Sequence, residues 1–261
     1  MRKKKKKSPL TGKPLRNPGQ SLDEEIRRLV DDKYNSYALF TTLIIAVAAM
    51  EWIRWYQQTP PQPLLWTFIA VSVLAYSSFR IYGLRQRVRR LRQGRDGEKA
   101  VGQYLELLRA SGCCVFHDIV GDGFNIDHVV LSQRGIYVIE TKTYSKPVRG
   151  EPIVLYQNEA LIIDGYDAGG AAIRQAKAEA GTVQKILKSC TGKKYPVKPV
   201  VVFPGWFVKP KDANKGSEVW VLNPKALPKF IESQPEILTA EDLRLASMHL
   251  SKHIRSLQVL G

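Results

Sequence analysis

Three charged side chains interrupt the apolar stretch NIDHVVLSQRGIYVIETK, which spans residues 125–142. They are Asp127, Glu140 and Lys142, and most of their neighbours are Val, Ile, Leu or Tyr. Removing such groups from water costs several kcal/mol per ion unless they pair or bind a metal. The charges therefore either face solvent or form a functional site.

The same stretch predicts two strands joined by the turn SQRG. Because side chains alternate along a strand, Glu140 and Lys142 share one face, and Asp127 shares a face of the neighbouring strand with Val129. Two carboxylates and a lysine can then meet at one end of the sheet. An ordinary exposed pair of Glu140 with Lys142 is the alternative.

The chemistry of such a trio is specific. Two carboxylates in a dry site cannot both stay ionised without a cation. Mg²⁺ prefers oxygen ligands and keeps several of its waters, and Mn²⁺ accepts similar ligands. A lysine beside the metal can orient a water molecule while the metal stabilises charge on a phosphate. This combination fits metal-assisted hydrolysis of phosphodiester bonds.

The elements that would position these groups form a mixed α/β domain from Asp96 onward. The segment GEKAVGQYLELLRASG predicts a helix with Glu98 on its buried-facing side. Strands are predicted at CCVFHDI, at NIDHVVL and GIYVIETK, at the hairpin PIVLYQ and EALIID, and later at PVVVFPGWFV and EVWVL. A long helix is expected at AGGAAIRQAKAEAGTVQKILKSC, and closing helices at PKALPKFIES and TAEDLRLASMHLSKHIRSL.

These segments resemble a known family. Asp127 followed by Glu140-Thr141-Lys142, between helices that carry Glu98 and Gln175, is similar to the core of the PD-(D/E)XK nucleases. The strings GEKAV, FNIDHVVLSQRGIYVIETK and RQAKAE resemble the nuclease-related domain, NERD, over roughly residues 96–205. Asn-Ile-Asp stands where the broader superfamily has Pro-Asp, as is usual for the nuclease-related branch.

The resemblance implies an α/β fold of the PD-(D/E)XK type, with a mixed central sheet flanked by helices. It implies that Asp127 and Glu140 bind Mg²⁺ or Mn²⁺, with the carbonyl of Thr141 as a third ligand, and that Lys142 is the catalytic lysine. The implied reaction is hydrolysis of nucleic acid, with DNA rather than RNA as the expected substrate.

Two further residues are implied by the same resemblance. Glu98 would lie near the metal on the first helix, and Gln175 would reach the site from the helix after the core strands. For Gln175 the alternative is a hydrogen bond to Glu179, one helical turn further on.

The net charge of +16 suggests nucleic acid or an anionic membrane as a partner. Residues 1–16 contain eight Lys or Arg, residues 80–95 contain seven Arg, and neither segment contains an acid. Without these fifteen, 25 basic residues face 24 acidic ones. The high pI is therefore not a sign of a DNA-binding surface on the folded domain.

Two apolar runs of 19 residues, 38–56 and 64–82, are long enough to cross a bilayer as helices. The connector QQTPPQP has no charge and breaks a helix, and Lys and Arg are dense before the first run and after the second. We expect a transmembrane hairpin with both termini in the cytoplasm. Glu51 and Arg54 interrupt the first run near its outer end. A cleaved signal peptide or buried core helices are the alternatives.

The expected organisation has five parts. A basic, mostly disordered segment precedes the hairpin, an Arg-rich linker follows it, and a C-terminal strand and helices pack on the nuclease-related domain. The corresponding ranges are 1–36, 37–83, 84–95, 96–210 and 211–261. Three cysteines form neither a disulfide framework nor a CxxC metal motif, so a reducing cytosol suits the chain.

Other conspicuous side chains are expected to have structural roles. His117 and His128 lack companions at metal-ligand spacing, and His128 points to the face opposite Asp127. Trp206 and Trp220 are core candidates. Tyr144, Lys146 and Arg149 follow the lysine and either contact phosphate or form a solvated loop.

Three functions follow, and in one of them the Lys/Arg segments recruit anionic lipid while the globular domain is only structural. The other two give the domain itself a function. The first is a membrane-anchored, cytosol-facing, metal-dependent nuclease. The second is a membrane-tethered module that binds nucleic acid or protein and has a vestigial nuclease site. The near-neutral charge of the domain favours the second, and the intact acidic and lysine positions favour the first.

Overall fold

The computed structural model describes residues 15–58, 62–121, 123–147, 150–157, 159–210 and 217–260. The chain forms two compact units. Residues 21–93 form a helical hairpin unit, and residues 94–261 together with 1–20 form a domain built on sheets. Arg149 and most of the basic N-terminal run, residues 1–14, lie outside the described residues.

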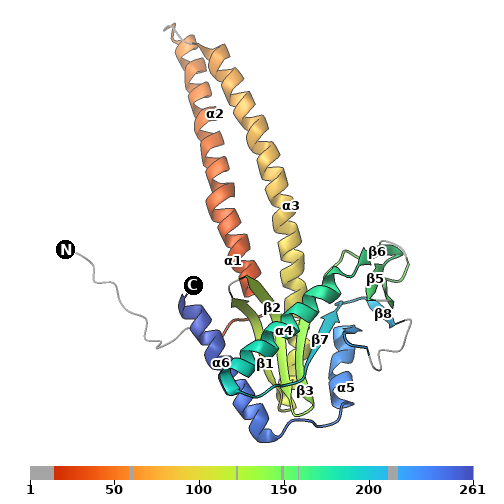
Figure 1. Cartoon of the computed structure of the whole chain (residues 1–261). Coiled ribbons are helices and arrows are strands. Elements are labelled where there is room, and N and C mark those ends of the chain that lie inside the picture. Colours follow the sequence, from red (N-terminus) through yellow and green to blue (C-terminus); the bar gives the residue numbers. More distant parts are fainter. Residues whose placement is uncertain are drawn as a thin grey trace, which may run out of the picture. The chain divides into compact units, whose positions relative to one another are not determined.

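The hairpin unit consists of helices. It contains α1 (Gln20–Arg28), the π-helical segment η1 (Leu29–Tyr34), α2 (Asn35–Tyr56) and the first part of the 48-residue helix α3 (Pro63–Ala110). Helices α2 and α3 run side by side along the hairpin (Figure 1). Nε1 of Trp52 donates to Oγ1 of Thr67 across it at 2.9 Å.

Both apolar runs are helical, as predicted, and both helices are long and apolar enough to cross a membrane. In each helix only 11% of the apolar window is buried within the chain. A core helix of a soluble domain would instead be covered by its neighbours. The Arg-rich segment that follows the second run belongs to the same continuous helix, α3.

The two charges inside the first apolar run are paired. Arg54 Nη1 donates to Oε1 of Glu51 at 3.0 Å, and the backbone N–H of Gln62 donates to Oε2 at 3.1 Å. Gln62 directly precedes α3, so the carboxylate of Glu51 also caps the N-terminus of that helix. An isolated charge in this apolar run would be costly, and these bonds offset that cost.

The central sheet of the domain has five strands in the order β1-β2-β3-β7-β9. Strands β1 (Cys114–Gly121), β2 (Phe124–Ser132) and β3 (Gly135–Thr141) form an antiparallel meander. Strands β7 (Val197–Val202) and β9 (Trp220–Leu222) extend it in parallel. The mixed sheet with flanking helices confirms the predicted fold class.

A second, smaller sheet has the order β6-β5-β4-β8. It contains β4 (Ile153–Gln157), β5 (Ala160–Ile163), β6 (Tyr166–Gly169) and β8 (Phe207–Pro210). The segment PVVVFPGWFV was predicted as one strand, and this was wrong. The chain turns at Pro204 and Gly205, so its first half is β7 of the central sheet and its second half is β8 of the smaller sheet.

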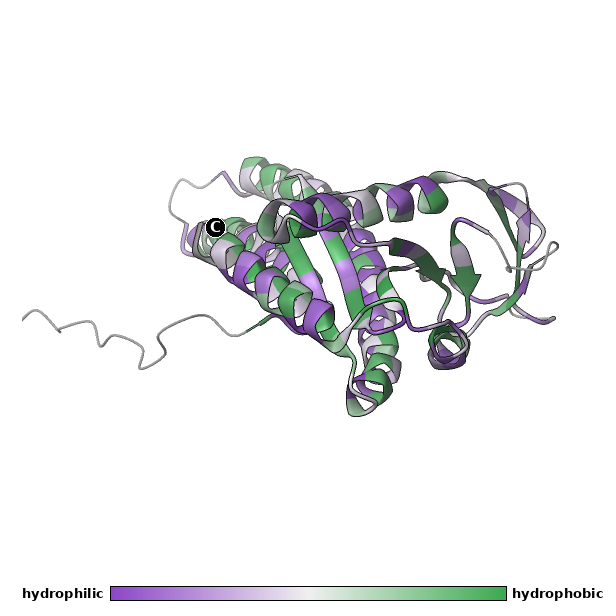
Figure 2. Cartoon of the chain, turned by 60° about the horizontal axis from the view of Figure 1, so that its bottom comes forward, coloured by the Kyte–Doolittle hydropathy of each residue, from purple (hydrophilic) through white to green (hydrophobic). Residues whose placement is uncertain are grey.

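Helices cover both faces of the central sheet. Helices α4 (Ala171–Thr191) and α6 (Ala240–Leu260) pack on the face that carries Val129 and Val138. The C-terminal part of α3 and α5 (Leu227–Glu232) pack on the face that carries Val130 and Ile139. Hydrophilic and hydrophobic residues alternate along α6, which ends at the label C in Figure 2, as in an amphipathic helix.

Candidate active site

The ladder between β2 and β3 ends at the pair His128 and Ile139. Asp127 and Glu140 are the next residues of the two strands, and their faces are those of Val129 and Val138. Beyond this point the ladder is replaced by a side-chain contact, because the backbone N–H of Thr141 donates to Oδ2 of Asp127 at 2.8 Å. Both carboxylates therefore lie at one end of the sheet, on one face.

Lys142 and helix α4 complete this side of the site. Nζ of Lys142 lies 2.6 Å from Oε1 of Glu140 and donates to Oε1 of Gln175 at 2.8 Å. Nε2 of Gln175 in turn donates to Oε1 of Glu179 at 2.8 Å. The structure thus places Gln175 against the lysine and also against Glu179, one turn further along α4.

Helix α3 brings Glu98 to the same end of the sheet. A Cβ atom on the preceding residue, Gly97, would lie 1.9 Å from Cγ2 of Thr143, so glycine allows the helix to approach the end of β3 closely. Glu98 receives a backbone hydrogen bond from Gly19. The adjacent strand β1 contributes Asp118, which is fully buried and accepts a hydrogen bond from Nε of Arg16.

The carboxyl groups of the cluster are nearly inaccessible to solvent. The exposed fractions of Glu98, Asp127, Glu140 and Glu179 are 6%, 7%, 3% and 6%. Burial, with the charges of Glu140 and Glu98, raises the pKa of Asp127 well above its usual value.

The pKa values of Glu98 on α3 and Glu179 on α4 are raised as well. Burial, with the charges of Asp118 and Glu140, raises the pKa of Glu98 to about 8. Burial, with the charge of Glu140, raises the pKa of Glu179 to about 8.

Lys142 is the cation at the centre of this cluster. Burial alone would lower its pKa, but the carboxylates of Glu140 and Asp127 raise it above the usual value of 10.5. Lys142 is therefore protonated at neutral pH and acts as a hydrogen-bond donor. One ammonium group cannot balance four ionised carboxylates, so without a further cation most of the cluster is protonated at neutral pH, and a bound cation would favour the ionised forms.

Unpaired oxygen atoms support the same conclusion. The Oε2 atoms of Glu98, Glu140 and Glu179 are buried and have no hydrogen-bond donor among the described residues. Buried acceptors of this kind are rare unless a ligand or ion binds them. The described residues contain no group of three His, Cys, Asp or Glu already arranged around one ion position. The donor set suits a hard cation that keeps part of its hydration, since such a cation needs only one or two carboxylates.

The sequence of this region matches a known family. Residues 93–204 match the family model described as "Nuclease-related domain", NERD. The chain contains a nuclease-related domain. An uncharacterised protein of Bacillus anthracis is 35% identical over 63 residues, which cover 22% of this chain and 30% of that protein. The chain thus spans under a third of the length of this curated relative.

One similar solved structure is that of Pyrococcus furiosus SfsA in complex with Ca²⁺. The sequence identity is 18%, the TM-score is 0.24, and the match covers 49% of this chain and 54% of that chain. At this TM-score the likeness says nothing about the site of the nuclease-related domain.

The nuclease-related domain brings the predicted residues to one end of its sheet. Asp127, Thr141, Glu140, Lys142 and Gln175 are linked by the hydrogen bonds and the ion pair described above. Glu98 joins them through charge rather than through a direct contact with the strands. Whether these residues bind metal or act in catalysis stays a prediction.

Three residues of the cluster were missed as site residues. Glu179 was considered only as a partner of Gln175, and Asp118 was read as part of an ordinary strand. Their signal is a lone acid in an otherwise apolar pattern, the signal that singled out Asp127. Arg16 gave no usable signal, because it lies among many other basic residues at the N-terminus.

His117 and His128 contact each other on the adjacent strands β1 and β2. Their Nδ1 atoms are 2.9 Å apart on the paired positions of β1 and β2, and Nε2 of His117 lies 3.5 Å from Glu106. Burial lowers the pKa of both rings, most strongly that of His128. Trp206 and Trp220 are buried in the cores of the two sheets.

Proposed function

We propose that this protein is a membrane-anchored, metal-dependent nuclease that hydrolyses phosphodiester bonds, with DNA rather than RNA as its substrate. The observation that carries the proposal is the ion pair of Glu140 and Lys142 beside Asp127, at the same sheet end as three unpaired carboxylate oxygens. A structural ion pair needs one carboxylate beside the lysine, whereas this site gathers four buried carboxyl groups around it.

The binding of the metal is assigned to the two strands. Asp127 and Glu140 would hold Mg²⁺ or Mn²⁺ through their carboxylates, with the Thr141 carbonyl as a third oxygen. When bound, the cation supplies positive charge that stabilises the negative charge developing on the scissile phosphate.

The remaining residues would orient the reactants. Lys142, held between Glu140 and Gln175, donates a hydrogen bond toward the attacking water or the phosphate and stays protonated throughout. Glu179 fixes the amide of Gln175, so it positions the lysine indirectly. Glu98 adds a carboxylate oxygen from the side of α3, where it can accept a hydrogen bond from a water molecule.

The hairpin supports the membrane part of the proposal. Its two apolar helices are long enough to span a bilayer and are largely uncovered by the rest of the chain. Basic residues at both ends of the apolar pair favour cytoplasmic termini, which would expose the nuclease-related domain to the cytosol.

A binding module with a vestigial site is the second candidate function. It is favoured by the near-neutral charge outside the two basic segments and by the lack of a ready-made three-residue metal site among the described residues. Such a protein would bind nucleic acid or another protein without cleaving it.

One experiment separates the two candidates. The full chain, purified in detergent, is incubated with plasmid DNA or single-stranded RNA in Mg²⁺, Mn²⁺ or EDTA, and cleavage and binding are both scored. We expect metal-dependent cleavage of DNA that Asp127→Asn abolishes, whereas Asp164→Asn, an exposed control, leaves it intact. Binding without cleavage in either metal would favour the module, and equal cleavage by Asp127→Asn would exclude the proposed site.

A further inference from the structure

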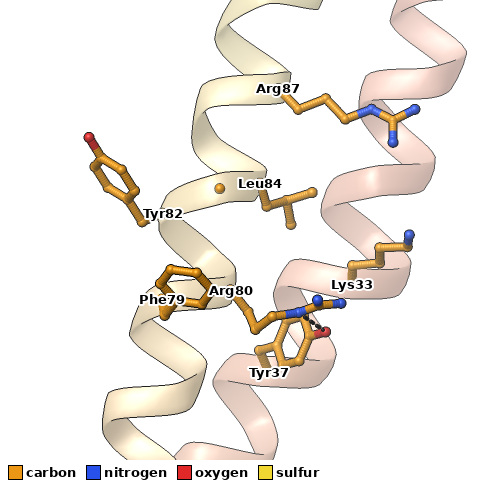
Figure 3. Close-up of a pocket in the computed structure, with 8 residues that line it drawn as sticks. Lys33, Tyr37, Phe79, Arg80, Tyr82, Leu84 and Arg87 are labelled. Atoms are coloured by element: carbon orange, nitrogen blue, oxygen red, sulfur yellow. Dashed lines mark hydrogen bonds between the residues drawn. The ribbon is translucent and has the colours of Figure 1, made fainter.

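A pocket of about 280 Å³ opens in the hairpin unit, where the apolar runs give way to basic residues. Three cations line it: Lys33 from η1, and Arg80 and Arg87 from α3. Figure 3 shows Arg80 and Arg87 both extending from α3 toward the facing helix, with Leu84 between them. Arg80, Leu84 and Arg87 are spaced i, i+4 and i+7, which places these three residues on one face of α3.

The cations of the pocket are only partly neutralised. Nε of Arg80 donates to the hydroxyl of Tyr37 at 3.1 Å, and its guanidinium lies 5.8 Å from the centre of that ring. Arg87 pairs with Glu25 at 2.6 Å. The side-chain ammonium of Lys33 makes no hydrogen bond or ion pair with any described residue. Three cations thus face one paired carboxylate, which leaves an excess of positive charge.

A second cavity, of about 500 Å³, adjoins the first and shares Tyr37 with it. Its other lining residues are Phe40, Val73 and Tyr76 together with the small serines Ser36, Ser72 and Ser77, and most of its lining surface is apolar. These residues lie further along the apolar runs than Lys33 and Arg80. The two cavities therefore form a charged end and an apolar end on one side of the hairpin.

We propose that these two cavities hold one anionic phospholipid. Its phosphate lies against Lys33, Arg80 and Arg87, and an acyl chain follows the groove of Phe40, Val73 and Tyr76. A soluble phosphate would match only the charged cavity, whereas a phospholipid matches both. The inference rests on the proposed insertion of the hairpin into a membrane, and it is independent of the proposed nuclease activity.

A small hydrophobic core next to the pocket fixes the positions of the segments that line it. Ile26, Leu29 and Val88 form a small buried core that packs α1 and η1 against α3. Lys33 and Glu25 are carried by these segments, so their distance from Arg87 is fixed by packing rather than by the lipid.

The test uses the full chain in phosphatidylcholine nanodiscs that contain a minority of phosphatidylglycerol. Lipids that remain bound after transfer to detergent are counted by native mass spectrometry. The wild-type chain should retain phosphatidylglycerol in preference to phosphatidylcholine. In the triple variant Lys33→Gln, Arg80→Gln, Arg87→Gln, the ratio of retained phosphatidylglycerol to phosphatidylcholine should fall about tenfold. The reason is that basic side chains near the membrane surface attract anionic lipid.

A matched control removes the same charge outside the pocket. Arg85, Arg89 and Arg90 are exposed on α3 and do not line either cavity, so their triple change to Gln should keep the preference. Equal losses in both triple variants would show general attraction of charge and would overturn the proposal. No preference in the wild-type chain would also overturn it.

A steric variant tests the pocket without changing charge. A Cβ on Gly83 would meet no atom within 4 Å, so Gly83→Leu can fill the first cavity without a clash at its Cβ. It should displace the lipid.

Glycerol phosphate in excess should not compete, and competition by it would assign the site to soluble phosphates. Alkaline extraction of membranes that contain each variant reports insertion, so a failure of the anchor is seen separately.

Discussion

Buried carboxylates occur in both units of this protein, and their surroundings differ. In the hairpin unit, Glu51 has a hydrogen-bond donor on each oxygen, one from Arg54 and one from the N–H of Gln62. In the domain, Glu98, Glu140 and Glu179 each leave one buried oxygen without a donor among the described residues. A carboxylate that serves only the fold is satisfied by its neighbours, whereas the domain keeps an excess of acceptors. The excess is what a bound cation would use.

The largest effect on DNA cleavage is expected from Lys142→Met, which tests the carboxylate cluster of the domain. The lysine bonds Glu140 and Gln175, so its loss should reduce DNA cleavage at least about a thousandfold. Binding of Mn²⁺ should persist, because the change frees Oε1 of Glu140 rather than removing a ligand. Cleavage and calorimetric Mn²⁺ titration measure the two effects, with Lys185→Met, an exposed residue of α4, as control. Retained cleavage would contradict the assignment of the lysine.

Glu179→Gln is expected to lower cleavage by about 10- to 100-fold, as is usual for residues that orient a metal site from outside. In EDTA the same variant should melt at a higher temperature than the wild type. The reason is that burial raises the pKa of Glu179 to about 8, so near neutral pH the folded state must take up a proton that the unfolded state has released, and the amide removes this cost. A lower melting temperature would mean that Glu179 stabilises the fold in the way that Glu51 does.

Glu51→Gln should have the opposite effect on stability. An amide offers one acceptor in place of two charge-assisted ones, so Arg54 or the N-terminus of α3 loses its partner. We expect a loss of roughly 1 kcal/mol in hairpin stability, measured by unfolding in SDS, and unchanged DNA cleavage. Gln57→Glu, an exposed change at the end of α2, is the control. An increase in stability would erase the distinction between the two units.

The last test concerns pH. The pKa of Glu98 is raised from 4.5 to about 8, so the folded state binds its proton more tightly than the unfolded state does. In EDTA its contribution therefore favours folding most below pH 4.5, declines as the pH rises to about 8, and is constant above. The difference in melting temperature between Glu98→Gln and the wild type should grow over this range. A difference independent of pH would mean that the pKa of Glu98 is the same in the folded and unfolded states.

The part of the site carried by the two strands could be predicted from the sequence. Alternation alone places Asp127, Glu140 and Lys142 on one face, and the turn SQRG fixes the register between their strands. The mixed α/β class follows from the same local patterns. These features depend on neighbouring residues, so they need no knowledge of distant contacts.

The parts that were missed depend on distant contacts. Arg16 meets Asp118 across 102 positions of the sequence, and no local pattern signals that pairing. The switch between sheets after β7 was missed because the apolar character of PVVVFPGWFV is continuous. Glu179 was read as a local partner because an i, i+4 pair on a helix is ordinary.

The pairing of Glu51 with Arg54 also bears on how the hairpin is assembled. Between Tyr37 and Phe79 these two are the only charged residues in the sequence, so the segment that the proposed membrane anchor would translocate has no net charge. Moving a lone ionised side chain through hydrocarbon is opposed far more strongly than moving a compensated pair. In the proposed anchor, the pairing of Glu51 with Arg54 would therefore lower the cost of bringing the tip of the hairpin through hydrocarbon.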